Sequence, residues 1–227
     1  MSDIFREVEE EVRREQAKEL WDRYGIYIIG VAVLIVLGTA GWRGWEWYSA
    51  KLAAENGAAY YEAMQLARDG KAQEAETAFD ALAGKGGGIA TLARLRAAAT
   101  MAANGDRPGA VGEYDAIANN SGIQSDLRNV ARVRAAFLLL EDGDRAGVEQ
   151  RVGEMAAEGN MWRASARELL GLAAYQAGDL EVASQRFEEL LGDPETPSDM
   201  RVRAQLMMSL LAADRGPAGE DKATDSQ

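Results

Sequence analysis

The chain has 227 residues, a formal net charge of -12, and neither cysteine nor histidine. Without cysteine there are no disulfides, thiolate metal sites or cysteine nucleophiles, and without histidine the commonest metal ligand and general base is missing. The acidic balance argues against nucleic-acid binding, because phosphate contacts use clustered Lys and Arg. Abundant Ala, Leu, Glu and Arg with only 4 prolines favour a helical protein.

Residues 1–23 form a charged N-terminal segment with a narrow apolar stripe at Ile4, Val8 and Val12. The spacing of that stripe predicts a helix. Two interpretations remain open for it. The helix is either a cytoplasmic contact for a partner, or a solvated helix supported by Glu–Arg pairs along its surface.

Residues 24–42 contain 19 consecutive uncharged residues. As a helix this run is about 28 Å long, close to the hydrocarbon thickness of a bilayer. Aromatic residues flank it on both sides, as in membrane spans: Trp21, Tyr24 and Tyr27 before, and Trp42, Trp45, Trp47 and Tyr48 after. A cleavable signal peptide has a shorter apolar run and a short basic leader, and a buried helix would not gather tryptophans at its ends. The pattern predicts a transmembrane helix.

Lys and Arg predict the orientation of this helix. Five basic residues precede the run, whereas only Arg43 and Lys51 follow within a similar distance. The positive-inside rule therefore places the N-terminus in the cytoplasm and the larger C-terminal part outside it. Residues 43–55 are expected to be a helical connector.

Four short motifs of the form Gly-polar-x-x-x-small recur along the rest of the chain. Their glycines, Gly70, Gly105, Gly143 and Gly178, are separated by 35, 38 and 35 residues. Glycine adopts the left-handed conformation that ends a helix, and the Asp that follows in three motifs can cap the next helix. Each unit is therefore predicted to be a helix–turn–helix.

The helix after each glycine carries a small or β-branched residue, then large apolar residues four and seven places on. These sets are Ala75/Phe79/Leu82, Ala110/Tyr114/Ile117, Val148/Val152/Met155 and Ala183/Phe187/Leu190. The preceding helices have small residues at Ala63, Ala98, Ala136 and Gly171, always twelve places before the first member of the set. Small residues at a crossing let two helices approach closely, and the large ones fill the adjoining space.

The pattern resembles tetratricopeptide repeats, most clearly in the last unit with its Leu170-Gly171, Tyr175, Gly178-Asp179 and Pro194. Ser198-Asp199 can cap a final helix to about Ala213, and residues 214–227 are expected to be a disordered tail. The predicted fold is all-α: one transmembrane helix, then a tetratricopeptide-like α-solenoid over 56–213 with four helical hairpins and an end helix. A helical bundle without repeats is the alternative.

Arrays of this kind generally bind ligands along their first helices. Projected onto this chain, that geometry predicts a protein-binding groove lined by Tyr60, Met64, Leu92, Leu95, Val133, Phe137, Leu140, Leu172 and Tyr175. The set is apolar enough to hold an extended hydrophobic segment or a partner helix. The alternative is that most of these residues simply form the core, with Tyr60 and Tyr175 the better candidates for a surface site.

The arrangement as a whole resembles the tetratricopeptide-like ancillary SecYEG translocon subunit family of Gram-negative inner membranes. A short charged N-terminus, a span, the Trp-rich exit Gly41-Trp42-Arg43-Gly44-Trp45 and degenerate repeats occur in the same order. The resemblance implies a periplasmic domain that associates with the translocon, periplasmic chaperones and exported clients.

The expected function is thus that of a scaffold or chaperone-like accessory factor. The alternative is a structural tether between the inner membrane and a cell-envelope or division complex. No paired-acid constellation suggests an enzyme, and no cofactor, metal, small-molecule substrate or nucleic acid is expected.

Overall fold

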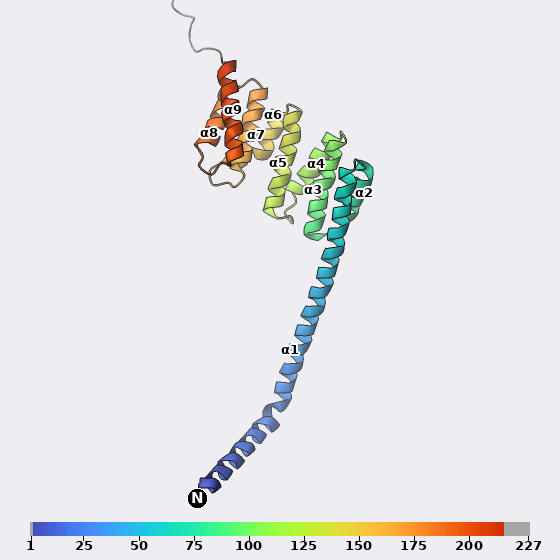
Figure 1. The fold of residues 1–227 in the computed structure, drawn as a ribbon, viewed down its shortest axis with the longest axis vertical. Coiled ribbons are helices and arrows are strands. Elements are labelled where there is room, and N and C mark those ends of the chain that lie inside the picture. The colour runs from blue at the N-terminus through green and yellow to red at the C-terminus, as the bar shows by residue number, and fades with distance from the viewer. Residues whose placement is uncertain (1, 216–227) are drawn as a thin grey trace, which may run out of the picture. The chain divides into compact units, whose positions relative to one another are not determined.

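The computed structural model describes residues 2–215, and within the first helix it describes the side chains of Arg14, Lys18 and every residue from Trp21 onward. Most of the predicted tail, from 216 to 227, and the side chains of the Ile4, Val8 and Val12 stripe lie outside this description. The chain divides into two compact units at Gly57/Ala58. Figure 1 labels their helices.

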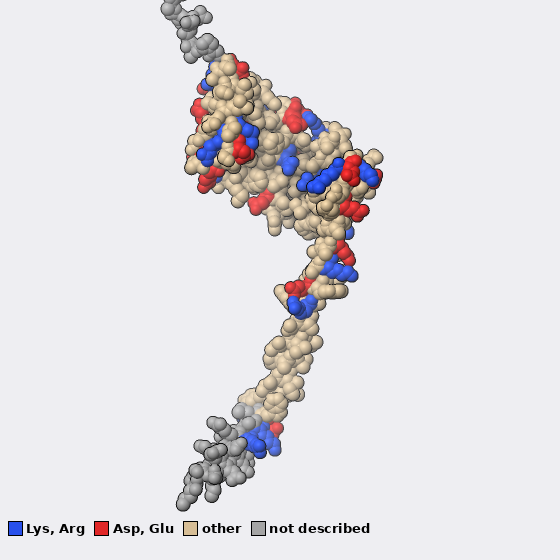
Figure 2. Space-filling view, viewed as in Figure 1, with Lys and Arg blue, Asp and Glu red and all other residues tan. Residues whose placement is uncertain are grey.

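The first unit is built on a single helix. Helix α1 (Ser2–Arg68) runs without interruption through the predicted charged segment, apolar run and connector. Figure 2 shows its apolar stretch free of Lys, Arg, Asp and Glu. Most large apolar side chains there are more than half exposed, with Ile26 at 76% and Leu34 at 69%. This is one helix long and apolar enough to cross a membrane, near the N-terminus of the described chain.

The aromatic residues at the C-terminal end of that stretch surround the helix. Trp42, Trp45 and Trp47 are each about 70% exposed. Since successive residues turn by about 100°, these three indoles point to different sides of α1. The ammonium of Lys51 lies 5.8 Å from the Trp47 ring. An aromatic belt on all sides suits a bilayer interface better than a contact with one protein partner.

The second unit, Ala58–Gln227, is a stack of helical hairpins (Figure 1). The last turns of α1 pair with the next helix, and three further hairpins and an end helix follow. The helices are α2 (Ala72–Ala83), α3 (Gly87–Ala103), α4 (Arg107–Ala118), α5 (Ser125–Glu141), α6 (Arg145–Val152), α7 (Arg163–Gln176), α8 (Leu180–Gly192) and α9 (Ser198–Asp214). The predicted fold class is confirmed.

The turns inside the hairpins form as their sequence predicts. Gly70, Gly105, Gly143 and Gly178 all have φ between 74° and 91°, the left-handed region that side chains with a Cβ disfavour. In the last three turns the following Asp caps the second helix; the Asp106 carboxylate, for instance, accepts a bond from the Gly109 amide at 3.0 Å. Lys71 occupies this position in the first turn and makes no side-chain cap.

The core lies between the two helices of each hairpin and between successive hairpins. All twelve residues of the predicted second-helix sets are at most 3% exposed, and so are Ala63, Ala98 and Ala136. A Cβ added to the buried Gly171 would lie 3.0 Å from Cζ of Phe187. The small residues therefore let the large ones of the same hairpin pack against the opposing backbone.

Two elements depart from the regular pattern. In the third hairpin α6 stops at Val152, and a 3-10 turn, η1 (Gly153–Ala156), replaces its last turn. The end helix α9 buries Ala204 and Leu211 against the last hairpin. Its opposite face exposes an apolar stripe at Val202, Leu206 and Leu210.

The helices form two layers. The first helices α3, α5 and α7 contact one another in sequence, and α7 also contacts α9. Among the described residues, the backbones of the second helices α2, α4, α6 and α8 lie beside first helices, η1 and, for α8, the end helix α9, and not beside each other. The face made by the first helices is therefore the side where residues from neighbouring hairpins come together.

Candidate protein-binding groove

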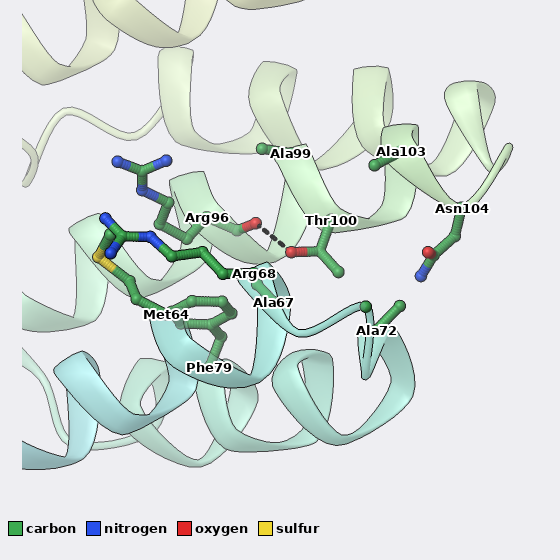
Figure 3. Close-up of a pocket in the computed structure, with 11 residues that line it drawn as sticks. Met64, Ala67, Arg68, Ala72, Phe79, Arg96, Ala99, Thr100, Ala103 and Asn104 are labelled. Atoms are coloured by element: carbon green, nitrogen blue, oxygen red, sulfur yellow. Dashed lines mark hydrogen bonds between the residues drawn. The ribbon is translucent and has the colours of Figure 1, made fainter.

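Two hollows lie along the first helices. The α1–α3 pocket has a volume of about 470 Å³ and is formed by the end of α1, the first turn of α2 and one face of α3. Met64 and Phe79 contribute apolar side chains to it, and Arg68 and Arg96 contribute charge. Figure 3 shows both guanidinium groups and the Met64 side chain at one end of the pocket, and Asn104 at the other.

The α3–α5 pocket follows in the next hairpin. It has a volume of about 680 Å³ and its wall is mainly apolar. Its lining includes Val133 and Phe137 of α5, Tyr114 of α4 and Trp162 just before α7. Ala99 lines both pockets. We therefore treat the two as one first-helix groove.

Three of the nine residues predicted for the groove line these pockets. Met64 lies in the α1–α3 pocket, and Val133 and Phe137 lie in the α3–α5 pocket. Phe137 is 44% exposed, whereas Val133 is nearly buried and also packs in the core of the third hairpin. Phe137 is thus the exposed large apolar side chain that the structure places in the groove.

The other six predicted residues lie around the groove or in the core. Tyr60 packs edge-on against Phe79, with ring centroids 5.7 Å apart, and its hydroxyl accepts a bond from Nε of Arg96 at 3.3 Å. Leu92 is exposed but lines neither pocket. Leu95, Leu140 and Leu172 pack with hairpin cores.

Tyr175 is held by the end helix. Its hydroxyl donates to Oδ2 of Asp214 at 2.8 Å, and this carboxylate is the main cause that raises the pKa of the phenol. The ring also packs against the core formed by α8 and α9. Its contacts therefore lie within the last hairpin and the end helix.

The arginines of the groove were missed by sequence reasoning that looked for apolar residues alone. Arg96 and Arg134 occupy the same repeat position, two places before the small residues Ala98 and Ala136. Arg68 follows Met64 by four residues and so shares its face of α1. The repeat register was sufficient to find the first pair.

Other arginines of the repeat domain join neighbouring hairpins. Arg107 pairs with Glu141 and Asp142 at 2.6 Å, and Arg145 pairs with Asp179 at 3.0 Å. Arg107 and Arg145 both directly follow the Gly-Asp of their turns, so each reaches the turn of the next hairpin. These pairs fix the stacking of hairpins two to four.

Two further hollows are lined by paired charges. In one, the guanidinium of Arg151 on α6 donates two hydrogen bonds, of 2.9 and 2.6 Å, to the carboxylate of Asp115 on α4. In the other, Arg163 and Arg167 converge on Asp193, and the bond from Arg163 lowers the pKa of that carboxyl to about 2. These paired charges join neighbouring helices, which gives them a structural explanation.

Comparison with known families agrees with the repeat geometry. The family described as tetratricopeptide repeat-like domain matches residues 18–211, which include the whole apolar run 24–42 and all four hairpins. Searches against curated proteins and against solved structures found no match. The chain belongs to the tetratricopeptide repeat-like domain family.

Proposed function

We propose that this protein is a membrane-anchored, non-catalytic scaffold that binds other proteins in its first-helix groove. The observation that carries the proposal is the groove itself, an apolar hollow with Phe137 exposed on a layer of rigidly stacked helices. Repeat domains of this family typically mediate protein–protein interactions. The exposed apolar side chains of α1 and their aromatic belt support an anchor in the bilayer.

We further propose that the anchor lies in an inner membrane with its N-terminus in the cytoplasm and the repeat domain in the periplasm. The excess of Lys and Arg before the apolar run supports this orientation. The likeness in segment order to ancillary translocon subunits supports the Sec translocon as the partner, with exported envelope proteins as clients. The scaffold would hold such clients or their chaperones near the translocon.

The anchor is tested by extraction and protease protection. Full-length protein in its native membranes should resist extraction at alkaline pH and dissolve in detergent. Protease added to the periplasmic side should digest the repeat domain and leave a short protected N-terminal fragment. Release at alkaline pH would contradict the anchor, and protection of the repeat domain would contradict the orientation.

The partner is tested by cross-linking in intact membranes, followed by mass-spectrometric identification of the adducts. Translocon subunits or exported proteins among the adducts are expected. Adducts that contain only cell-envelope or division proteins would replace this assignment by a structural tether. They would leave the scaffold function in place.

A further inference from the structure

The α1–α3 pocket lacks a negative charge. Arg68 and Arg96 bring two guanidinium groups to one end of it, and its described lining contains neither Asp nor Glu (Figure 3). In the described chain the only side-chain bond from Arg96 is to the Tyr60 hydroxyl, and Arg68 makes none. Both side chains are exposed, so they present two like charges to a ligand that enters the pocket. In a chain of net charge -12, such a site is unusual and favours an anion.

The positive charge continues into the α3–α5 pocket. Arg134 lines that pocket and has no carboxylate partner among the residues described. The acid that lines the pocket, Glu141, is already paired with Arg107 at 2.6 Å. Burial raises the pKa of the Tyr114 phenol, and the positive charges of Arg134 and Arg96 partly offset that rise. Both guanidinium groups therefore act on the same part of the groove.

The repeat register sets the spacing of these two arginines. Arg96 and Arg134 hold equivalent positions on α3 and α5, which are adjacent first helices. Packed helices lie about 8–10 Å apart, and an extended segment in the polyproline II conformation advances about 3.1 Å per residue with three residues per turn. Two carboxylates three residues apart in such a segment lie on one face about 9 Å apart, which would match the two arginines.

The rest of the groove favours apolar side chains and hydrogen-bond acceptors. Met64 and Phe137 offer accessible apolar surface along the groove, and the buried Phe79 and Val133 form part of its wall. The guanidinium groups that line the groove donate hydrogen bonds and accept none. A peptide supplies both: apolar side chains, and backbone carbonyls that accept hydrogen bonds.

We propose that the first-helix groove selects an extended, polyproline II-like segment of a partner protein in which two acidic residues three apart are separated by apolar ones. Arg96 and Arg134 bind the two acids, and Arg68 adds to the positive electrostatic potential in the α1–α3 pocket. Phe137 contacts an apolar side chain of the segment. The inference rests on the proposed function, that the groove binds proteins, and names the chemistry of what it binds.

The test is peptide binding to the full-length chain in detergent micelles, followed by fluorescence anisotropy. The probe is a short fluorescein-labelled peptide of Glu, Leu and Phe with two Glu three residues apart, and its counterparts carry Gln or Lys instead of Glu. The Glu peptide should bind roughly tenfold more tightly than the Gln peptide at low salt, the Lys peptide most weakly, and added salt should narrow the difference.

The arginines are tested with matched variants. Arg134→Gln should lower the affinity for the Glu peptide about threefold, and the double variant with Arg96→Gln should lower it about tenfold. The affinity for the Gln peptide should change little. Arg132→Gln is the control, because Arg132 lies on the same helix and bonds only to Asn129 in the described chain, yet lines another hollow. It should bind like the unchanged protein. Circular dichroism should show the same helical signal in all variants.

Three results would overturn the acidic preference. They are equal affinity for the Glu and Gln peptides, equal loss in Arg132→Gln and Arg134→Gln, and competition by a single-stranded oligonucleotide as strong as by the Glu peptide. If the Glu and Gln peptides bind with equal affinity, weaker binding of both to the Phe137→Ser variant would still show that the groove is a protein-binding site. Failure of every peptide to bind would also reject the preference, and the membrane cross-links would then decide the proposed function separately.

Discussion

Several arginines at the later boundaries between hairpins bond to a carboxylate across the boundary, whereas in the described chain Arg68 and Arg96 at the first boundary, like Arg134 on α5, do not. Between hairpins two and three, Arg107 and Arg151 each bond to a carboxylate across the boundary, and Arg145 does so between hairpins three and four. Arg203 of α9 bonds to Glu168 of α7 at 2.6 and 3.0 Å. In contrast, Arg68 and Arg96, beside the first boundary, have no carboxylate partner in the described chain.

This difference separates two uses of the same residue type. Where an arginine meets a carboxylate one repeat away, both charges are satisfied and the contact fixes how hairpins stack. Where it meets only a phenol or nothing, the charge stays available to a ligand. We infer that the later hairpins form the rigid part of the scaffold and that the first two, with α5, form its binding surface.

The largest expected loss of stability is for a core substitution, compared with a substitution in the groove. Phe187→Ala should lower the free energy of unfolding by about 3–5 kcal/mol, because the buried ring packs against Gly171 and leaves a cavity. Phe137→Ala, at a partly exposed groove position, should cost less than about 1 kcal/mol. Urea unfolding followed by circular dichroism measures both. Equal losses would show that Phe137 is a core residue.

The next effect concerns acid stability of the rigid part. Bonds from Arg163 hold the pKa of Asp193 at about 2, below its unfolded value near 4. The stabilisation from this carboxylate is therefore complete above about pH 5 and is lost as the pH falls toward 2. Asp193→Asn should be less stable than the unchanged protein at pH 7, and its stability should fall less steeply between pH 4 and 2. Identical acid unfolding curves would contradict the role given to this cluster.

A smaller effect is expected for a single pair across a boundary. In a double-mutant cycle of Arg151→Gln and Asp115→Asn, the two-bond pair should show a coupling energy of about 1 kcal/mol. Thermal or urea unfolding of the four proteins gives this value. A coupling indistinguishable from zero would mean that apolar packing alone fixes the stacking of hairpins two and three.

The smallest effect on stability is expected for the unpaired arginines. Arg68→Gln and Arg96→Gln remove charges that repel each other, so the free energy of unfolding should stay within about 0.5 kcal/mol or rise slightly. The same unfolding measurements apply. A loss of stability as large as that from a paired arginine would show that Arg68 or Arg96 contributes to the fold as the carboxylate-paired arginines do.

The fold could be predicted from the sequence because its determinants are local and repeated. Gly105 must be left-handed, Asp106 caps the next helix, and the small and large residues recur at fixed places in every unit. The groove could be predicted only in part. Leu140 and Phe137 share one helix, yet one is 7% exposed and the other 44%, because exposure depends on how the next hairpin packs.

The partners of the charged residues were also harder to predict, because they too depend on how neighbouring hairpins pack. A guanidinium reaches several ångströms from its helix, so its partner depends on the neighbouring turn and not on spacing alone. Arg107 at the start of α4 has carboxylates of the next hairpin within bonding distance, whereas Arg96 in the middle of α3 has none in the described chain. Sequence periodicity identified the helices and did not distinguish paired from unpaired arginines.

Site-specific photo-cross-linking in native membranes tests the central claim most directly. A photoreactive residue at Phe137 samples the groove, and one at the exposed Gln185 on α8 is the control. We predict defined protein adducts from position 137 that are absent at position 185 and that weaken with excess Glu-containing peptide. Adducts that are the same at both positions, or none from position 137, would contradict the claim that the first-helix groove binds proteins.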